Sequence, residues 1–286
     1  MATIAQLTTK DAPTWCPGCG DFLILSTLKM AIAELNLPTE QVAITSGIGC
    51  GSKMPHFVKT YGFEGLHGRA LPVASGIRLA NHTIKTITVT GDGDGYGIGG
   101  NHFLHTMRRN LNITHIIEDN QVYGLTKGQY SPTSRKGFKS PSTPSGGLEE
   151  PINPLAVGIA GGATFVARGY AMDILHLKAI IKEAIQHKGY SLVDVLQPCP
   201  TYNKINTQQT YSVSVRKIDP ATHNAEDKQA ALKLAEEWGP NIPIGIFYKV
   251  QRPTYEEQLP QLNGTPLAQQ DIKNINMEQA FRRYLY

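Results

Sequence analysis

The stretch Thr86-Ile87-Thr88-Val89-Thr90, followed at once by Gly91-Asp92-Gly93-Asp94, decides how this chain folds. Its β-branched residues predict a buried strand over 86–90. A second apolar run, predicted as a strand over 113–118, leads into Asp119-Asn120. Neighbouring strands of a parallel α/β sheet end side by side at the carboxyl edge, where ligands bind. We therefore expect Asp92 and Asn120 to face each other.

These two side chains fit a magnesium site. Mg²⁺ takes oxygen ligands, usually one or two from the protein and the rest from water and substrate phosphates. Asp92, Asn120 and a backbone carbonyl near Val122 meet that need. The glycines beside Asp92 let the backbone approach a diphosphate, and a helix after Gly100 would direct its amides at the same anion. A lone Gly-Asp-Gly is more often an ordinary turn, but the second strand ending in Asn120 favours the metal site.

Strand-like and helix-like segments alternate along the chain. Further strands are expected over 42–46, 164–168, 191–196 and 244–250. Helices are expected from Asp21, over 70–81, from Pro154, over 174–187 and over 225–238, with caps at Asp21, Asn153 and Asp173. This alternation predicts an α/β fold with a doubly wound parallel sheet. We expect an α/β domain over 1–200 and a C-terminal extension, 201–286, packed on it.

Four cysteines stand beside glycine or proline in loop-like sequence: Cys16, Cys19, Cys50 and Cys199. Four thiolates suffice for one [4Fe-4S] cluster, and the Cys-x-x-Cys pair would supply two of them from one turn. They would also suffice for a structural Zn²⁺. A redox dithiol or a set of unligated thiols would fit the same residues. The loop context favours ligation over core packing.

The Gly-Asp-Gly segment with the distant Asn120 resembles the thiamine diphosphate (ThDP) signature. That resemblance implies that Asp92, Asn120 and the carbonyl of Val122 bind Mg²⁺. ThDP chemistry on a 2-oxo acid leaves an electron-rich intermediate, which an iron-sulfur cluster can oxidise and which zinc cannot. With both signatures in one chain, the stretch from about Trp15 to Cys199 is similar to the β subunit of 2-oxoacid:ferredoxin oxidoreductases.

The resemblance implies the site residues one by one. Cys16, Cys19, Cys50 and Cys199 would hold one [4Fe-4S] cluster. From its position three residues beyond Cys50, Lys53 is a candidate cation for the substrate carboxylate, with an ordinary solvated lysine as an equal alternative, and Leu125 would face the substrate side chain. His67 would contact the cofactor, where a structural histidine is the alternative. The implied cofactor-binding residues are Ile48, Gly49, Cys50, Gly51, His67, Gly91, Gly93, Asp94, Gly124, Leu125 and Thr126.

The resemblance also implies a reaction and partners. It implies oxidative decarboxylation of a 2-oxo acid with coenzyme A to acyl-CoA, CO₂ and reduced ferredoxin. The form Trp15-Cys16-Pro17-Gly18-Cys19-Gly20 resembles members that act on 2-oxoglutarate. No glutamate stands in a recognisable context for activating ThDP, so an α subunit would complete the site in an αβ heterodimer or a dimer of heterodimers. The alternatives are a subunit of a non-redox ThDP decarboxylase or carboligase, and a non-catalytic electron-transfer subunit.

Composition agrees with a soluble enzyme subunit. The chain has 286 residues, is 41% hydrophobic and carries a net charge of +4. That charge is too small to indicate nucleic-acid binding, and it suits an acidic ferredoxin. No apolar stretch reaches a membrane-spanning length of about 18 residues, and the start lacks the core of a signal peptide, so we expect a cytoplasmic protein without membrane contact. The long polar loop over 127–153 is interpreted as a lid or partner contact, with an inert insertion as the alternative.

Overall fold

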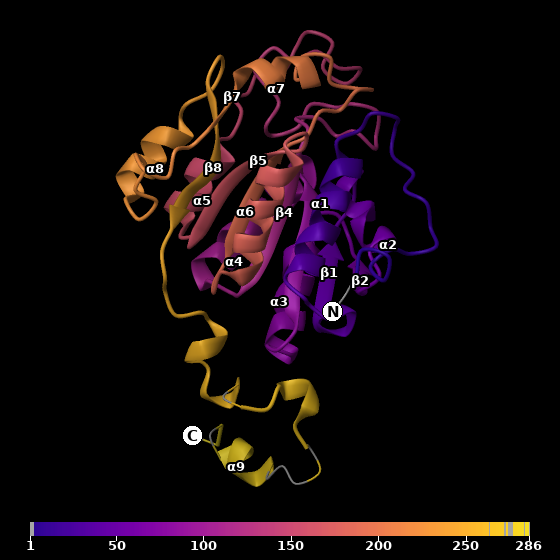
Figure 1. The fold of residues 1–286 in the computed structure, drawn as a ribbon. Helices are drawn as coiled ribbons and strands as arrows, with labels where there is room; N and C mark the ends of the chain where they lie inside the picture. Colours follow the sequence, from indigo (N-terminus) through magenta and orange to yellow (C-terminus); the bar gives the residue numbers. More distant parts are fainter. Residues whose placement is uncertain (1–2, 263, 272, 274–276, 283, 286) are drawn as a thin grey trace.

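The fold is a single mixed sheet with helices on both faces (Figure 1). The computed structural model describes residues 3–262, 264–271, 273, 277–282, 284 and 285. Its eight strands lie in the order β2-β1-β3-β4-β6-β5-β8-β7. Their bounds are β1 Val42–Ser46, β2 Tyr61–Glu64, β3 Lys85–Gly91, β4 Ile113–Asp119, β5 Phe165–Tyr170, β6 Ser191–Leu196, β7 Val215–Lys217 and β8 Ile242–Lys249.

The sheet confirms the predicted α/β class. At one edge, however, β8 and β7 run opposite to the direction expected for a wholly parallel sheet. The six strands from β2 to β5 run parallel, but β8 pairs antiparallel with β5, and β7 runs parallel to β8. The strand expected over 244–250 therefore exists, but the sheet is not wholly parallel. Neither β2 nor β7 was predicted, because β2 is exposed throughout and β7 has three residues. Beyond residue 200, β7 and β8 continue the same sheet, and the division at residue 200 stays a prediction.

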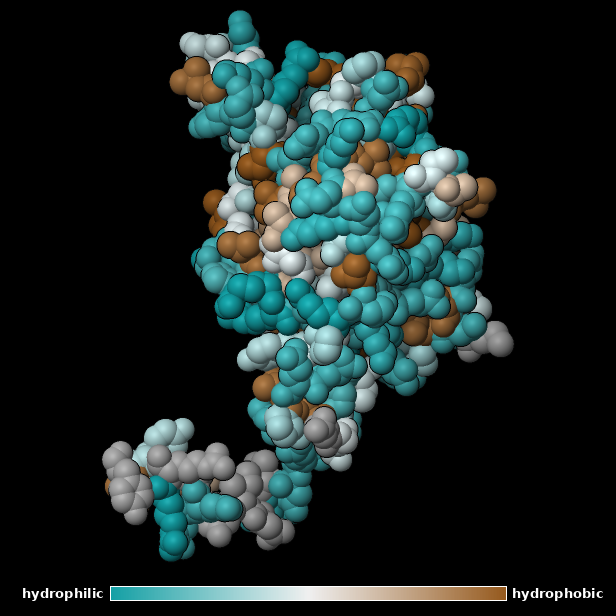
Figure 2. Space-filling model, turned by 90° about the vertical axis from the view of Figure 1, so that its left-hand side faces the viewer, coloured by the Kyte–Doolittle hydropathy of each residue, from teal (hydrophilic) through white to brown (hydrophobic). Residues whose placement is uncertain are grey.

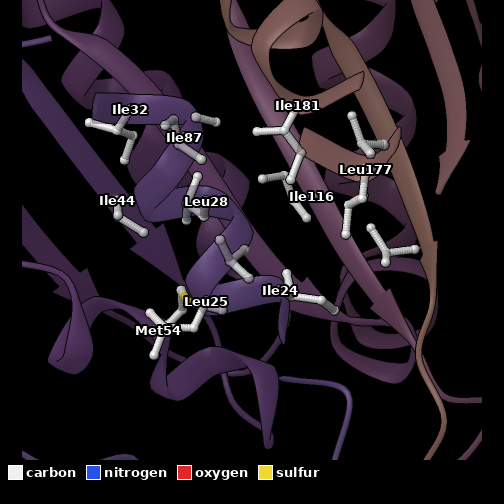
Figure 3. Close-up of a cluster of buried hydrophobic side chains, with 14 of the residues drawn as sticks. Ile24, Leu25, Leu28, Ile32, Ile44, Met54, Ile87, Ile116, Leu177 and Ile181 are labelled. Carbon is white, nitrogen blue, oxygen red and sulfur yellow. The ribbon is translucent and has the colours of Figure 1, made fainter. Parts of the chain in front are cut away.

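Two apolar cores hold the helices against the sheet. On one face, α1 (Asp21–Glu34) and α6 (Ile174–Gln186) pack side chains such as Leu28 and Ile181 on Ile87 and Ile116 (Figure 3). On the other face lie α3 (Ala70–Ala80), α4 (Gly100–Arg109), α5 (Pro154–Gly161) and α8 (Lys228–Ala235). Shorter helices are α2 Met54–Phe57, α7 Gln208–Ser214 and α9 Met277–Arg282. Helices on both faces are the mark of a doubly wound sheet.

Two of the three predicted helix caps are confirmed. The Asn153 side chain accepts a hydrogen bond from the Ala156 amide at 3.1 Å, and Asp173 accepts one from His176 at 3.3 Å. The prediction for Asp21 was wrong, because α1 already includes this residue and its N-cap is Gly20. The helix expected over 225–238 is also shorter, since α8 is capped by Asp227 and ends at Ala235.

The loop over 127–153 and the chain after β8 differ in how they contact the rest of the protein. The loop over 127–153 has no helix or strand. Its first part nevertheless packs into the protein interior, because Ser131, Thr133 and Ser134 are buried. After β8 the chain is tied back by the buried ion pair of Arg78 and Glu256 at 2.6 Å and then leaves the sheet, with α9 well away from it (Figure 1). Figure 2 shows this segment projecting below a mostly hydrophilic face.

Candidate cofactor site

One cavity gathers all the predicted cofactor and magnesium residues. It lies at the carboxyl ends of β1, β3 and β4, where strand ends of such sheets bind ligands. Sequence reasoning missed one lining residue, Tyr123, because an aromatic residue in a loop carries no distinct signal. The complete lining is Ile48, Gly49, Cys50, Gly51, His67, Gly91, Asp92, Gly93, Asp94, Asn120, Val122, Tyr123, Gly124, Leu125 and Thr126.

Glycines keep this cavity open. A Cβ placed on Gly49 or Gly91 would meet no described atom within 4 Å, so a side chain at either position would stand in the cavity itself. Gly49 also has a φ of +140°, a conformation that disfavours other residues. The two glycines thus leave space where a bound molecule could touch the backbone.

Asp94 joins three loops at the cavity wall. Its Oδ1 lies 2.5 Å from His67 Nδ1 and accepts hydrogen bonds from the amides of Gly68 at 2.7 Å and Ile48 at 3.0 Å. Its Oδ2 is buried and has no hydrogen-bond partner in the described structure. This oxygen lies against Gly47, where a Cβ would stand 2.1 Å from it.

Asp92 is held by hydrogen bonds from the loop over 127–153. Its Oδ2 accepts hydrogen bonds from Ser131 Oγ at 2.5 Å and Thr133 Oγ1 at 2.6 Å. Burial raises the pKa of Asp92 to about 6, against the opposing effect of these hydroxyl groups. A bound cation would favour the charged carboxylate. Sequence reasoning did not single out Ser131 or Thr133, since a serine and threonine pair is common in polar loops.

Asn120 sits in a tight turn directly after β4. Its Oδ1 accepts a hydrogen bond from the Val122 amide at 3.0 Å, across Gln121, whose φ is +59°. Asn203 donates to the Asn120 carbonyl at 2.9 Å and fixes the same turn. The turn brings the Asn120 side chain and Val122 to the lining that Asp92 also shares. The oxygen donors fit the preference of Mg²⁺, and their role as ligands stays a prediction.

The loops that carry the four cysteines converge beside this cavity. The Gly20 amide donates to the Pro198 carbonyl at 3.3 Å, which joins the first cysteine loop to the last. The Trp15 indole donates to the Cys50 carbonyl at 2.7 Å, and Gln197 donates to Cys19 Sγ at 3.1 Å. All four cysteines are free thiols. In the described part of the chain, no three His, Cys, Asp or Glu side chains converge as one metal ion would require.

Cys50 belongs both to the cofactor cavity and to the group of cysteine loops beside it. It lines the cavity, and its Sγ lies 3.5 Å from where a Cβ on Gly124 would stand. Burial raises the pKa of the Cys50 thiol to about 12, and burial together with Asp21 raises the pKa of Cys19 well above its usual range. A thiolate at either position therefore needs a compensating positive charge, which a metal centre supplies.

Two buried carboxyl groups lie close to Cys19 and Cys50. Asp21 and Glu118 are buried side by side, and their carboxyl groups interact with each other. Glu118 Oε2 would lie 2.1 Å from a Cβ on Gly51, so only glycine fits there. Burial raises the pKa of Asp21 to about 6 and the pKa of Glu118 further above its usual range.

Lys53 is not brought into the cavity. Its ammonium donates to Thr14 Oγ1 at 3.2 Å, and it is absent from the lining. Leu125 does line the cavity and is 47% exposed. The substrate roles of both residues stay predictions.

Comparison with known proteins identifies the family. Residues 47–195 match the model of the thiamine pyrophosphate enzyme C-terminal TPP binding domain. Residues 199–264 match the C-terminal model of the pyruvate ferredoxin oxidoreductase β subunit. The chain is 49% identical over 271 residues to the 2-oxoacid:ferredoxin oxidoreductase 1 β subunit of Aeropyrum pernix, an alignment that covers 91% of this chain and 85% of that one. The chain belongs to the β subunits of the 2-oxoacid:ferredoxin oxidoreductases.

Other members agree with this assignment. The 2-oxoglutarate synthase subunit KorB of Methanocaldococcus jannaschii is 35% identical, with 87% of this β subunit and 92% of that one covered. A solved 2-oxoglutarate:ferredoxin oxidoreductase from Magnetococcus marinus, with 2-oxoglutarate, coenzyme A and succinyl-CoA bound, superposes with a TM-score of 0.91. It is 39% identical, with 99% of this β subunit and 96% of that chain covered. The predicted family and its oxidoreductase class are thus confirmed.

The matched ThDP domain encloses the whole cavity lining, from Ile48 to Thr126. A ThDP-binding domain of the family is therefore present in this β subunit. None of the helices in the described ranges combines the length and the apolar character needed to cross a membrane.

Proposed function

We propose that this β subunit binds ThDP and Mg²⁺ in the cavity, holds one [4Fe-4S] cluster beside it, and takes part in the oxidative decarboxylation of 2-oxoglutarate. One observation carries the proposal: Cys50 lines the cavity while its loop is joined to the loop of Cys16 and Cys19. Decarboxylation and electron removal would then take place side by side.

In this proposal, different lining residues bind the Mg²⁺ ion and different parts of ThDP. Asp92, Asn120 and the Val122 carbonyl hold Mg²⁺, and the metal neutralises the diphosphate. Gly91 and Gly93 let the backbone approach the diphosphate. When bound, ThDP supplies the nucleophilic carbon that attacks a 2-oxo group and allows CO₂ to leave. His67, held by Asp94, contacts the cofactor.

Four thiolates, from Cys16, Cys19, Cys50 and Cys199, would hold the cluster. A structural Zn²⁺ needs all four thiolates about 2.3 Å from one point. Hydrogen bonds join the three loops that carry the thiols, and a redox-active cluster suits the reaction because Zn²⁺ has no redox chemistry. When bound, the cluster supplies one-electron transfer to ferredoxin, and the net charge of +4 suits an acidic partner.

The site is completed by an α subunit in this proposal. The cavity holds about 80 Å³, while pockets that enclose a ligand of this class are usually about 300–1,000 Å³. The described residues of the lining also include no glutamate to activate ThDP. Both observations support a half-site that another chain closes, in an αβ heterodimer or a dimer of heterodimers.

The substrate follows from the relatives and the first cysteine motif. The Magnetococcus marinus structure, which resembles this chain over nearly its whole length, contains 2-oxoglutarate, coenzyme A and succinyl-CoA. In the proposed reaction, 2-oxoglutarate loses CO₂, coenzyme A accepts the acyl group, and two electrons pass to ferredoxin singly. Leu125 faces the substrate side chain, and Lys53 would have to leave Thr14 to meet a carboxylate.

The substrate assignment is tested with the β subunit purified together with its α subunit without oxygen. Reduction of ferredoxin is measured with 2-oxoglutarate and with pyruvate, each with and without coenzyme A. We expect kcat/KM for 2-oxoglutarate to exceed that for pyruvate at least tenfold and to require coenzyme A. Release of CO₂ without ferredoxin reduction would contradict the proposal.

A further inference from the structure

A second cavity lies on the opposite side of the end of β4. It holds about 230 Å³, and Asp119 and Gln121 line it, whereas Asn120 and Val122 line the cofactor cavity. One stretch of chain, at the end of β4 and in the turn after it, thus forms a wall of both cavities.

The second cavity contains a buried arginine whose donors are mostly unused. Arg168, on β5, is 1% exposed and lines the cavity. Its one hydrogen bond within the described residues runs from Nε to Asp194 Oδ2, at a long 3.4 Å. Its Nη1 is buried without a partner. A guanidinium has five N–H donors in a planar fork, so an unused edge of this kind requires an acceptor.

Aromatic rings hold this guanidinium in place. Its central carbon lies 5.0 Å from the ring centroid of Trp238 and 5.5 Å from that of Phe247. Asp194 does not satisfy the whole guanidinium, because its Oδ2 meets only Nε, while its Oδ1 accepts a hydrogen bond from the Tyr96 hydroxyl at 2.9 Å. Arg168 is therefore fixed in orientation before any ligand arrives, which lowers the entropy cost of binding.

The rest of the cavity is suited to an anion with an apolar body. Arg135 adds a second positive charge at the exposed mouth, opposed there by the exposed Glu236, and the buried Asp119 also lines the cavity near Arg168. Helix α5 begins at the wall with Asn153 and Pro154, and a helix N-terminus carries partial positive charge. Further walls are apolar, from Ile152, Ala235 and Trp238.

We propose that the second cavity is a binding site for a small organic carboxylate, held through the Arg168 guanidinium. The planar fork of arginine matches a carboxylate in a two-point contact. The apolar walls suit the hydrocarbon part of an organic acid. Inorganic phosphate offers no such part, and its greater negative charge is opposed by the carboxyl groups of Asp194, Asp119 and Glu236, so the site discriminates against it.

The test uses the intact αβ complex and isobutyrate, which has no 2-oxo group for the proposed reaction to use. Calorimetric titration with isobutyrate is compared with titrations of isobutyramide and inorganic phosphate. We expect saturable binding of isobutyrate at one site per β subunit, and at least tenfold weaker binding of the other two compounds. Equal binding of isobutyramide or phosphate would overturn the proposal.

Variants locate the site. Arg168→Gln is expected to weaken isobutyrate binding at least tenfold, Arg168→Lys less, and the exposed control Arg108→Gln not at all. If Arg168→Gln yields no folded complex, Ala235→Leu fills the cavity from a residue that is 2% exposed and should also abolish binding. Unchanged binding in Ala235→Leu, or in a folded Arg168→Gln complex, would overturn the proposal. The readout does not require ThDP or the cluster, so its failure leaves the proposed function standing.

Discussion

The Nδ1 atom of His67 lies 2.5 Å from Oδ1 of Asp94, in a contact that joins the loop before α3 to the turn after β3. The contact fixes the imidazole at the wall of the cofactor cavity and leaves Nε2 as the nitrogen available to a ligand. Asp94 is therefore a positioning residue for His67.

Asp94→Asn should weaken ThDP binding by at least tenfold. The amide keeps the shape but loses the charge that His67 and the amides of Gly68 and Ile48 share. Hydrogen bonds to charged groups contribute ~1.5–3 kcal/mol each, and ~1.4 kcal/mol is tenfold in affinity. The Kd of ThDP is measured in the αβ complex, with Asp219→Asn in an exposed turn as control. Equal affinity in the Asp94 and Asp219 variants would show that Asp94 has no part in binding.

Asn120→Ala should abolish Mg²⁺-dependent ThDP binding. The substitution removes a predicted metal ligand and also the hydrogen bond to the Val122 amide that shapes the turn. ThDP binding is titrated at increasing Mg²⁺ in the αβ complex. The control Asn224→Ala removes an asparagine side chain from an exposed turn, where it accepts from the Glu226 amide. A wild-type Mg²⁺ profile in Asn120→Ala would remove this residue from the metal site.

Gly47→Ala should disrupt the cavity, although this residue does not line it. A Cβ there would stand 2.1 Å from Asp94 Oδ2, so the carboxylate must move away from His67. We expect a loss of ThDP affinity similar to that of Asp94→Asn. Gly76→Ala, in α3, is the matched control because its Cβ would meet no described atom within 4 Å. If both alanine variants bind ThDP alike, the packing around Asp94 is looser than the structure indicates.

Buried His115 should make stability fall in acid. It is 0% exposed, contacts Thr90 and Tyr190 through its two nitrogens, and burial lowers its pKa from 6.5 to about 3. The unfolded chain takes up a proton below pH 6.5 and the folded chain does not, so this contribution is present above pH 6.5 and lost as pH falls toward 3.

The comparison with His115→Gln isolates that contribution. Other groups titrate alike in both proteins, so the stability advantage of the wild type should shrink by ~1 kcal/mol between pH 7 and pH 5.5. Thermal unfolding of the two complexes at both pH values measures it. A constant difference would show that His115 is already protonated, or solvated, in the folded protein.

The sequence predicted the cofactor cavity better than the edges of the fold. Asp92 and Asn120 could be paired because parallel strands end together, a rule that needs no tertiary detail. The direction of β8 could not be predicted, since an apolar run reads the same in either direction. Asp21 resembled an N-cap by residue type, yet it lies inside α1, buried beside Glu118, a neighbour far away in sequence.

The second cavity had no sequence signal at all. Arg168 stands in a strand beside Gly169, where a charged residue indicates neither burial nor an unused guanidinium. Its surroundings come from Trp238 and Phe247, which fold onto β5 from the C-terminal part of the chain. Long-range packing of this kind is visible only in the structure.

The central claim, that a ThDP site and an iron-sulfur cluster act together in this β subunit, is tested most directly by iron analysis and EPR. The complex is purified without oxygen, its iron and acid-labile sulfide are measured, and spectra are recorded before and after 2-oxoglutarate is added. Cys199→Ser serves as the cluster-deficient variant, and Thr201→Ala, an exposed neighbour, as its control. The account predicts about four irons and four sulfides per β subunit. It also predicts a radical or reduced-cluster signal that requires substrate, with the iron and the signal lost in Cys199→Ser only. Zinc or no metal in the wild type, with CO₂ still released from 2-oxoglutarate, would contradict it.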